Sequence, residues 1–171
     1  MTVNEPVKPL NIHATGLVLD GVGVLLRGPS GAGKSLLALE LIERQALRGG
    51  VGQLVADDRV DLSAEDGRLL MHTPPAIAGL IELRGWGIVG RPYIESATVD
   101  LVVDLVDALA RMLEPEELET DLLGVTLPRC PVPRRGVIDS AHQLLLVGEA
   151  LGSPDIRSKD LGGRAFLQKT T

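Results

Sequence analysis

Apolar and polar positions alternate with different periods along the first third of the chain. Residues 13–28 contain two apolar runs separated by Asp20-Gly21, a dipeptide typical of two-residue hairpin turns, and this pattern predicts two antiparallel strands. Residues 34–48 repeat apolar positions at helical spacing until Gly49-Gly50, which predicts a helix that ends at the glycine pair. We therefore expect a hairpin, a glycine-rich loop and a helix in succession.

The middle of the chain is dominated by short extended segments. Residues 52–58 predict a buried strand that ends in two carboxylates, and residues 59–73 predict a second hairpin with its turn at Glu65-Asp66-Gly67. Residues 76–90 follow a proline pair and predict a short helix, a turn and an extended piece. Residues 97–107 alternate and are rich in β-branched side chains, which predicts one core strand.

The last third of the chain mixes helical and proline-rich segments. Residues 108–122 are acidic and predict a helix at the surface, whereas the prolines of residues 124–136 predict an edge strand or a loop. Residues 137–151 predict a last helix.

A chain of 171 residues is expected to form one domain with short appendages. We expect a loose arm over residues 1–11, an α/β domain over residues 12–152 and a polar tail over residues 153–171. No internal repeat or low-complexity tract is visible.

Composition and charge exclude some classes of function. The net charge is −6, and the only aromatic residues are Trp86, Tyr93 and Phe166, so we expect no binding of nucleic acid; a basic protein partner fits this charge better. The single cysteine, Cys130, suits a reducing compartment. No signal peptide or membrane-spanning apolar run is recognisable, so we expect a cytoplasmic protein without membrane contact.

The glycine-rich segment is a complete phosphate-binding motif. It matches G-x-x-x-x-G-K-[ST] between a predicted strand and a predicted helix, so its backbone N–H groups can surround the phosphates of a nucleotide. Lys34 would reach the β- and γ-phosphates and Ser35 would help to hold Mg²⁺. The expected binding residues for ATP are Gly28, Pro29, Ser30, Gly31, Ala32, Gly33, Lys34 and Ser35.

Two further groups of polar residues suit phosphoryl transfer. Of Asp57 and Asp58, one carboxylate can organise Mg²⁺ while the other takes the proton of an attacking hydroxyl; alternatively, the pair caps a turn at a solvated strand end. Glu82 and Arg84 lie two residues apart on an extended run, which suits metal ligation and charge stabilisation, or an ordinary surface ion pair. The chain lacks the N-K-x-D motif of GTPases.

Taken together, "GPSGAGKS", "LVADDRV" and "IELRGWGI" resemble the catalytic domain of HPr kinase/phosphorylase from about His13 to Ala150. The resemblance implies a P-loop kinase fold of the type shared with phosphoenolpyruvate carboxykinase, with a mixed sheet and a hairpin before the P-loop. It also implies an Mg²⁺- and ATP-dependent kinase that phosphorylates a serine of the phosphocarrier protein HPr, and a homo-oligomer, expected to be a hexamer. The chain would be a short form without the family's additional N-terminal domain.

The resemblance also implies roles for individual residues. His13, which alone would be an ordinary strand-start histidine, becomes an active-site residue, and Asp58 becomes the base, with Asp57 orienting it or the metal. Glu82 joins Ser35 as an Mg²⁺ ligand. Arg84 and Arg111 are the expected catalytic arginines.

Three questions about activity stay open from the sequence. The family's dephosphorylation loop is present only in the altered form "PVPRRGV", so we expect phosphorolysis to be weaker than kinase activity, with Arg134 and Arg135 beside the phosphoserine. The alternatives are a nucleotide-binding regulatory protein that transfers nothing and a small-molecule P-loop kinase. His72, His142 and Cys130 are expected to have no catalytic role, and no zinc-ligand spacing is present.

Overall fold

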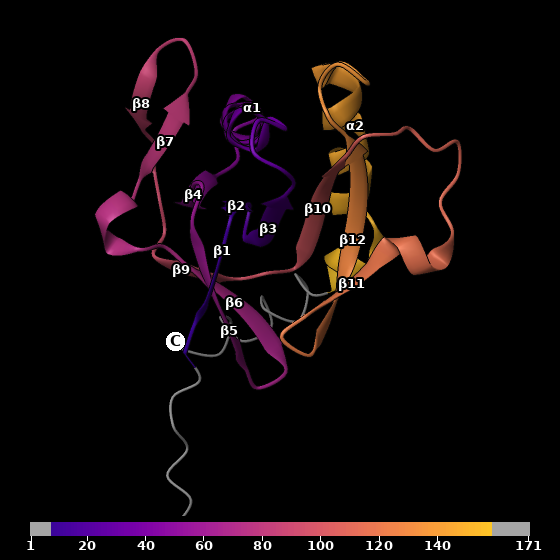
Figure 1. Cartoon of the computed structure of the whole chain (residues 1–171), viewed down its shortest axis with the longest axis horizontal. Coiled ribbons are helices and arrows are strands. Elements are labelled where there is room, and N and C mark those ends of the chain that lie inside the picture. The colour runs from indigo at the N-terminus through magenta and orange to yellow at the C-terminus, as the bar shows by residue number, and fades with distance from the viewer. Residues whose placement is uncertain (1–7, 159–171) are drawn as a thin grey trace, which may run out of the picture.

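The structure is a computed structural model that describes residues 8–158. Its centre is a mixed six-stranded sheet in the order β11-β12-β10-β3-β2-β4. A four-stranded sheet in the order β1-β5-β6-β9 packs on one face, helices α1 and α2 cover the other, and the β7–β8 hairpin stands beside α1 (Figure 1). The fold is therefore α/β with a mixed sheet, as the sequence predicted.

The bounds of the elements follow the chain in this order: β1 Leu10–Ile12, β2 Ala14–Leu19, β3 Val22–Arg27, α1 Lys34–Leu47, β4 Gly52–Ala56, β5 Val60–Glu65, β6 Arg68–His72, a 3₁₀ turn Pro75–Ile77, β7 Leu80–Leu83, β8 Gly87–Gly90, β9 Ser96–Thr98, β10 Leu101–Val106, a 3₁₀ turn Pro115–Leu118, β11 Glu119–Leu122, β12 Val125–Pro133 and α2 Ser140–Leu151. Among the described residues no helix has the length and apolar character needed to cross a membrane.

The central strands are apolar on both faces because both faces are covered. On β3, Val24 and Leu26 belong to the core under the helices, while Leu25 points into the core between the two sheets. β10 shows the same division, with Leu101 and Val103 under the helices and Val102 on the opposite side. Successive side chains of a strand face opposite sides, so near-continuous apolar runs mark the centre of the sheet.

The directions of the strands bring several strand ends to one edge. β3 and β12 both pair with β10 in parallel, whereas β2 pairs antiparallel with β3 and with β4. The carboxyl ends of β3, β4, β10 and β12 therefore meet the beginning of β2 at the same edge. The glycine-rich loop follows β3, so this edge contains the candidate site.

A charged cluster ties the three parallel strands together just below this edge. Asp104 on β10 accepts hydrogen bonds from Arg27 Nε and Nη2, at 2.7 and 2.8 Å, and from Arg129 Nε at 2.5 Å. Burial acts to raise the pKa of Asp104, but the hydrogen bonds and charges of the two arginines outweigh it and leave that pKa below its ordinary value.

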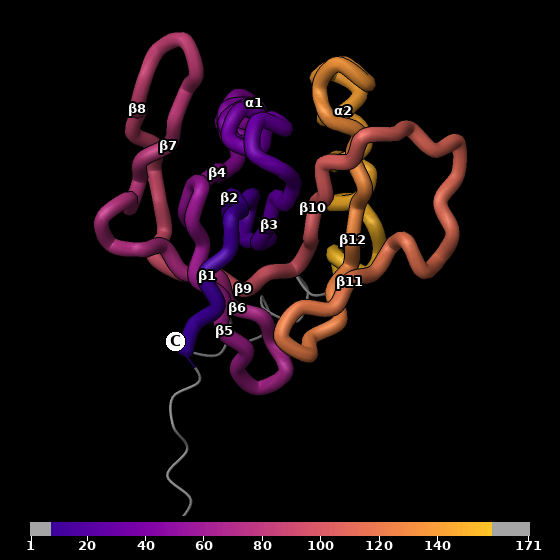
Figure 2. The backbone as a smooth tube through the Cα atoms, viewed as in Figure 1, coloured from indigo at the N-terminus to yellow at the C-terminus, as the bar shows by residue number. Residues whose placement is uncertain are grey.

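Two expected elements differ in the structure. Residues 97–107 form two strands, β9 and β10, because the chain passes from the outer sheet to the central sheet at residues 99–100. Residues 108–122 are not a helix: an irregular loop leads to a 3₁₀ turn that begins at Pro115, and β11 follows because it pairs with β12. The path of this excursion is clear in Figure 2, beside β12.

The proline-rich segment is a strand, β12. Its first part pairs with β11 and its second part with β10, so each part has a free side where a missing N–H is tolerated. The prolines within it are Pro128, Pro131 and Pro133.

The expected arm and tail are partly ordered. Leu10 and Asn11, which we placed in the arm, belong to β1 and pair with β5. Residues 154–158 are helical, and Ile156, which we placed in the polar tail, is buried in the core. The remainder of the predicted arm and tail, residues 1–7 and 159–171, lies outside the described residues.

Candidate active site

The glycine-rich loop between β3 and α1 has the conformation of an anion-binding loop. Gly28, Gly31 and Gly33 all have positive φ angles, of 152°, 80° and 96°, which only glycine adopts without strain. No side chain caps the N-terminus of α1, so its first N–H groups are available to a ligand. A helix N-terminus of this kind favours phosphate groups.

Lys34, the first residue of α1, folds back over this loop. Its Nζ donates hydrogen bonds to the carbonyl oxygens of Gly28 and Pro29, at 2.8 and 3.1 Å. Burial lowers the pKa of Lys34, and the negative charges of Asp58 and Asp57 act against this decrease. Lys34 thus places a positive charge beside the loop, in the pocket that the loop helps to line.

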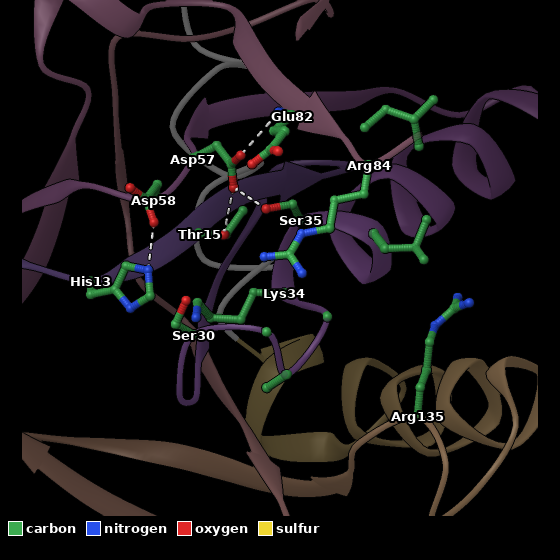
Figure 3. Close-up of a pocket in the computed structure, with 15 residues that line it drawn as sticks. His13, Thr15, Ser30, Lys34, Ser35, Asp57, Asp58, Glu82, Arg84 and Arg135 are labelled. Atoms are coloured by element: carbon green, nitrogen blue, oxygen red, sulfur yellow. Dashed lines mark hydrogen bonds and ion pairs between the residues drawn. The ribbon is translucent and has the colours of Figure 1, made fainter. Parts of the chain in front are cut away.

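Asp57 is the most strongly held side chain of the site. It directly follows β4 and is buried; its Oδ1 accepts hydrogen bonds from Thr15 Oγ1 at 2.9 Å and from Ser35 Oγ at 2.7 Å. Its Oδ2 accepts from the backbone N–H of Glu82 at 3.2 Å. One carboxylate therefore connects β2, α1 and β7 to the end of β4 (Figure 3).

Asp58 lies next to His13 and is accessible to a substrate. Oδ1 of Asp58 lies 2.5 Å from Nε2 of His13, and the side chains are 68% and 37% exposed. The antiparallel register of β2 and β4 pairs Gly16 with Ala56, so the residue before β2 and the second residue after β4 meet. Asp58 has a φ of 67°, an uncommon angle for a residue other than glycine.

Glu82 and Arg84 belong to the β7–β8 hairpin and its tip. Both line the pocket, as expected because alternate residues of an extended segment face the same side, and Ile81, the residue before Glu82, is buried in the core. No ion pair joins Glu82 and Arg84 among the described residues, which argues against the alternative of an ordinary surface pair. In Figure 3, Arg84 extends toward the middle of the labelled group.

These side chains surround one pocket of about 300 Å³. The pocket brings together most of the residues predicted from the sequence: His13, Ser30, Gly31, Ala32, Gly33, Lys34, Ser35, Asp57, Asp58, Glu82 and Arg84. Gly28 and Pro29 do not line it but supply the carbonyl oxygens that Lys34 contacts. Arg111 does not line it: this residue is exposed on the irregular loop after β10.

Two polar residues of the pocket were missed or not distinguished. Thr15 was not predicted, although the expected hairpin places it beside the glycine-rich loop. The signal available in the sequence was a threonine within an otherwise apolar strand, and the structure shows that this threonine is buried. Arg135 lines the pocket, whereas its neighbour Arg134 is directed to Asp107 in an ion pair of 2.5 Å. The sequence treated these two arginines as equivalent.

The donor set suits a hard cation bound together with phosphate. Ser35 Oγ and the carboxylate of Asp57 lie in hydrogen-bond contact, and Glu82 lines the same pocket, so hydroxyl and carboxylate oxygens converge. Mg²⁺ prefers such oxygens and usually completes its coordination with phosphates and water. No group of three or more His, Cys, Asp or Glu side chains is placed to hold a metal within residues 8–158.

Comparisons with known proteins show which family this chain is similar to. Residues 7–142 match the family model described as the HPr serine kinase C-terminal domain. Among curated proteins, the HPr kinase/phosphorylase of Clostridium tetani is 32% identical over 145 residues, 78% of this chain and 46% of that protein. The HPr kinase/phosphorylase of Streptococcus thermophilus is 34% identical over 164 residues, 89% of this chain and 50% of that protein.

A solved structure is also similar. It is the Hpr(Ser) kinase/phosphatase from Coxiella burnetii, with a TM-score of 0.65 and 29% identity, and the match covers 91% of this chain and 99% of that one. The chain spans about half the length of the curated relatives it matches. Because the family model matches most of the chain, the chain belongs to the HPr serine kinase C-terminal domain family.

Proposed function

We propose that this protein is a protein-serine kinase that uses Mg²⁺ and ATP and phosphorylates an HPr-type phosphocarrier protein. The observation that supports this most directly is the position of Asp58: an accessible carboxylate, hydrogen-bonded to His13, lines the same pocket as the phosphate loop and Lys34. Pure nucleotide binding requires no such base. The relatives named above are HPr kinases, so HPr is the acceptor to test first.

In the proposed reaction, Asp58 takes the proton of the serine hydroxyl as the serine oxygen attacks the γ-phosphorus. The new bond joins that oxygen to phosphorus, the bond to the β–γ bridging oxygen breaks, and ADP leaves. His13 holds Asp58 in place at 2.5 Å, and Asp57 orients Ser35 through its hydrogen bond of 2.7 Å. Lys34 and Arg84 lie where they can offset the negative charge that develops on the phosphate oxygens.

Ser35 and Glu82 are the proposed ligands of Mg²⁺, with Asp57 beside them. The ion supplies charge neutralisation and orientation of the phosphates when it is bound. Arg111 lies outside the pocket, so a catalytic role would require the loop after β10 to move; this role remains a proposal.

The decisive experiment is phosphoryl transfer from γ-labelled ATP to HPr. We expect labelling of HPr in the presence of Mg²⁺, and a decrease of at least about 100-fold with Asp58→Asn. Asp66→Asn is the matched control, since Asp66 is an exposed aspartate with a similarly positive φ of 49° at the β5–β6 turn. Tight ATP binding without transfer to HPr, or full labelling by the Asp58→Asn variant, would refute the proposal.

The reverse reaction belongs to the same proposal. Inorganic phosphate would occupy the loop, attack the phosphoserine phosphorus and form pyrophosphate, while protonated Asp58 returns its proton to the serine oxygen. We propose that this activity is weaker than the kinase activity. Production of pyrophosphate from phosphorylated HPr at a rate equal to the forward reaction would contradict this order.

Finer features of the family are proposed on the same basis. We propose the P-loop kinase fold of the type shared with phosphoenolpyruvate carboxykinase, a hexameric assembly and a cytoplasmic location. Light scattering tests the assembly, and a monomer at micromolar concentration would exclude the hexamer.

A further inference from the structure

Arg135 lies against the phosphate loop although it comes from a distant part of the chain. It follows β12 by two residues and lines the pocket together with the loop. A Cβ atom built on Gly33 would lie 3.9 Å from Cδ of Arg135, so the aliphatic part of the arginine covers the last glycine of the loop. Arg135 thus adds a cationic side chain to the pocket that contains the phosphate loop.

Glu40 of α1 is the present partner of this guanidinium. Nη2 of Arg135 donates to Oε2 of Glu40 at 2.5 Å, and the two side chains are 35% and 29% exposed. Figure 3 shows the side chain of Arg135 extending from the loop after β12, on the opposite side of the pocket from His13 and Asp58. Glu40 therefore neutralises a cation that faces the phosphate loop.

The pairing leaves the arginine incompletely satisfied. Nε of Arg135 is buried and has no hydrogen-bond partner among the described residues. A buried donor without a partner is costly, and a guanidinium normally binds carboxylate or phosphate through two parallel hydrogen bonds. The contact with Glu40 thus uses less of the hydrogen-bonding capacity of Arg135 than a phosphate could use.

The backbone around Arg135 is fixed, so a change of partner involves the side chain. The N–H of Arg134 donates to the carbonyl of Val106 at 2.8 Å, and Nε2 of the buried Gln143 donates to the carbonyl of Pro133 at 2.9 Å. These contacts anchor the loop to β10 and to α2 immediately before Arg135.

We propose that Arg135 is a second phosphate-binding residue of the pocket and that Glu40 is its competing partner: an anion of the phosphate class, bound next to Gly33, replaces Glu40 at the guanidinium. This inference rests on the proposed function for the identity of the anion. It adds a contact from the β12–α2 loop and assigns Glu40 the role of holding Arg135 when no anion is bound. Glu40 acts only through Arg135 and is not itself a catalytic residue.

The test measures binding of inorganic phosphate to the full chain by isothermal titration calorimetry at fixed low ionic strength. Arg135→Ala should bind phosphate about tenfold more weakly than the wild type, because a charge-assisted hydrogen bond is lost. Arg134→Ala removes the same charge from the neighbouring, exposed arginine and should stay within about twofold of the wild type.

Glu40→Gln should bind phosphate about threefold more tightly, since the competing carboxylate is removed. Glu43→Gln is the matched control, because Glu43 lies one turn further along α1 and pairs with Arg91 instead. In the double variant with Arg135→Ala, the gain from Glu40→Gln should disappear, as expected if the two residues act as one unit. Circular dichroism verifies that each variant is folded, and Arg135→Gln replaces Arg135→Ala if the alanine variant unfolds.

Several results would overturn the inference. Unchanged phosphate affinity in Arg135→Ala would show that the arginine does not contact the anion. Weaker binding by Glu40→Gln, or a gain that persists without Arg135, would show that Glu40 does not compete for the guanidinium. Failure of HPr labelling alone would refute the proposed kinase reaction and leave the phosphate titrations as an independent test.

Discussion

Thr15 provides a sharp test of how the site is held together. Its side chain is buried on β2, and its hydroxyl donates one of the hydrogen bonds that Asp57 accepts. Thr15→Val keeps the shape of the side chain and removes this donor, so one oxygen of a buried carboxylate keeps only Ser35 as a side-chain donor. We expect both lower stability and slower phosphoryl transfer.

The expected loss of stability can be estimated from two opposing effects. A hydrogen bond to a charged group contributes about 1.5–3 kcal/mol. The additional buried methyl group of valine restores about 0.8 kcal/mol. The net decrease in the free energy of unfolding is then about 1–2 kcal/mol, which corresponds to a decrease in Tm of about 3–6 °C for a domain of this size.

Urea denaturation followed by circular dichroism measures this difference, and the m value should not change. Thr126→Val is the matched control, since Thr126 is exposed and donates to Asp121 at 2.5 Å on the β11–β12 hairpin. Its expected effect is below about 0.5 kcal/mol because both partners are solvated. Equal effects of the two substitutions would show that the buried hydrogen bond to Asp57 has no special importance, and the reasoning would fail.

Three other predictions concern stability and reactivity. The lowered pKa of Asp104 adds stability that is present above its unfolded pKa of about 3.9 and lost as pH falls through the lower folded pKa. Urea titrations should therefore show the advantage of the wild type over Asp104→Asn at neutral pH and a smaller advantage below about pH 4; an advantage independent of pH would contradict this. Gly23→Ala would place Cβ 1.7 Å from the backbone carbonyl oxygen of Thr98 on β9, so Tm should fall sharply. Gly148→Ala on α2 meets open space and should raise the free energy of unfolding by about 0.5–1 kcal/mol. Similar Tm values for the two variants would refute the clash at Gly23. Burial raises the pKa of Cys130 to about 11, so alkylation by iodoacetamide at pH 8 should be slow until urea unfolds the protein, and rapid alkylation of the folded protein would refute this.

The parts of the fold that were predicted from the sequence are those set by local chemistry. Asp20-Gly21 forms the turn between β2 and β3, and both residues have positive φ, as the primed turns of hairpins require. The helix after the glycine-rich loop ends at Leu47, close to the glycine pair that predicted its end. These signals act within a few residues, so tertiary contacts did not alter them.

The parts that were not predicted depend on pairing between distant segments. Residues 97–107 have the same β-rich composition throughout, and only the two partners β6 and β3 show that they belong to different sheets. The acidic segment that suggested a helix forms β11 because β12 offers a partner, and Pro115 begins a 3₁₀ turn instead of continuing a longer helix. Propensity favoured the wrong element here because strand pairing decided the outcome.

The residues of the candidate site also fall into two groups: those positioned by neighbouring residues in the chain and those positioned by strand pairing. A sequence motif identifies only the first group. Lys34 and Ser35 were identifiable because the residues that position them are consecutive in the chain. Asp58 and His13 are 45 residues apart, so their contact depends on the register of β2 against β4, which the sequence pattern did not specify. Arg134 and Arg135 have the same chemistry and adjacent positions, yet one pairs with Asp107 outside the pocket and the other covers Gly33 within it. A substitution of both arginines would mix two unrelated effects, and separate substitutions are required to assign either one.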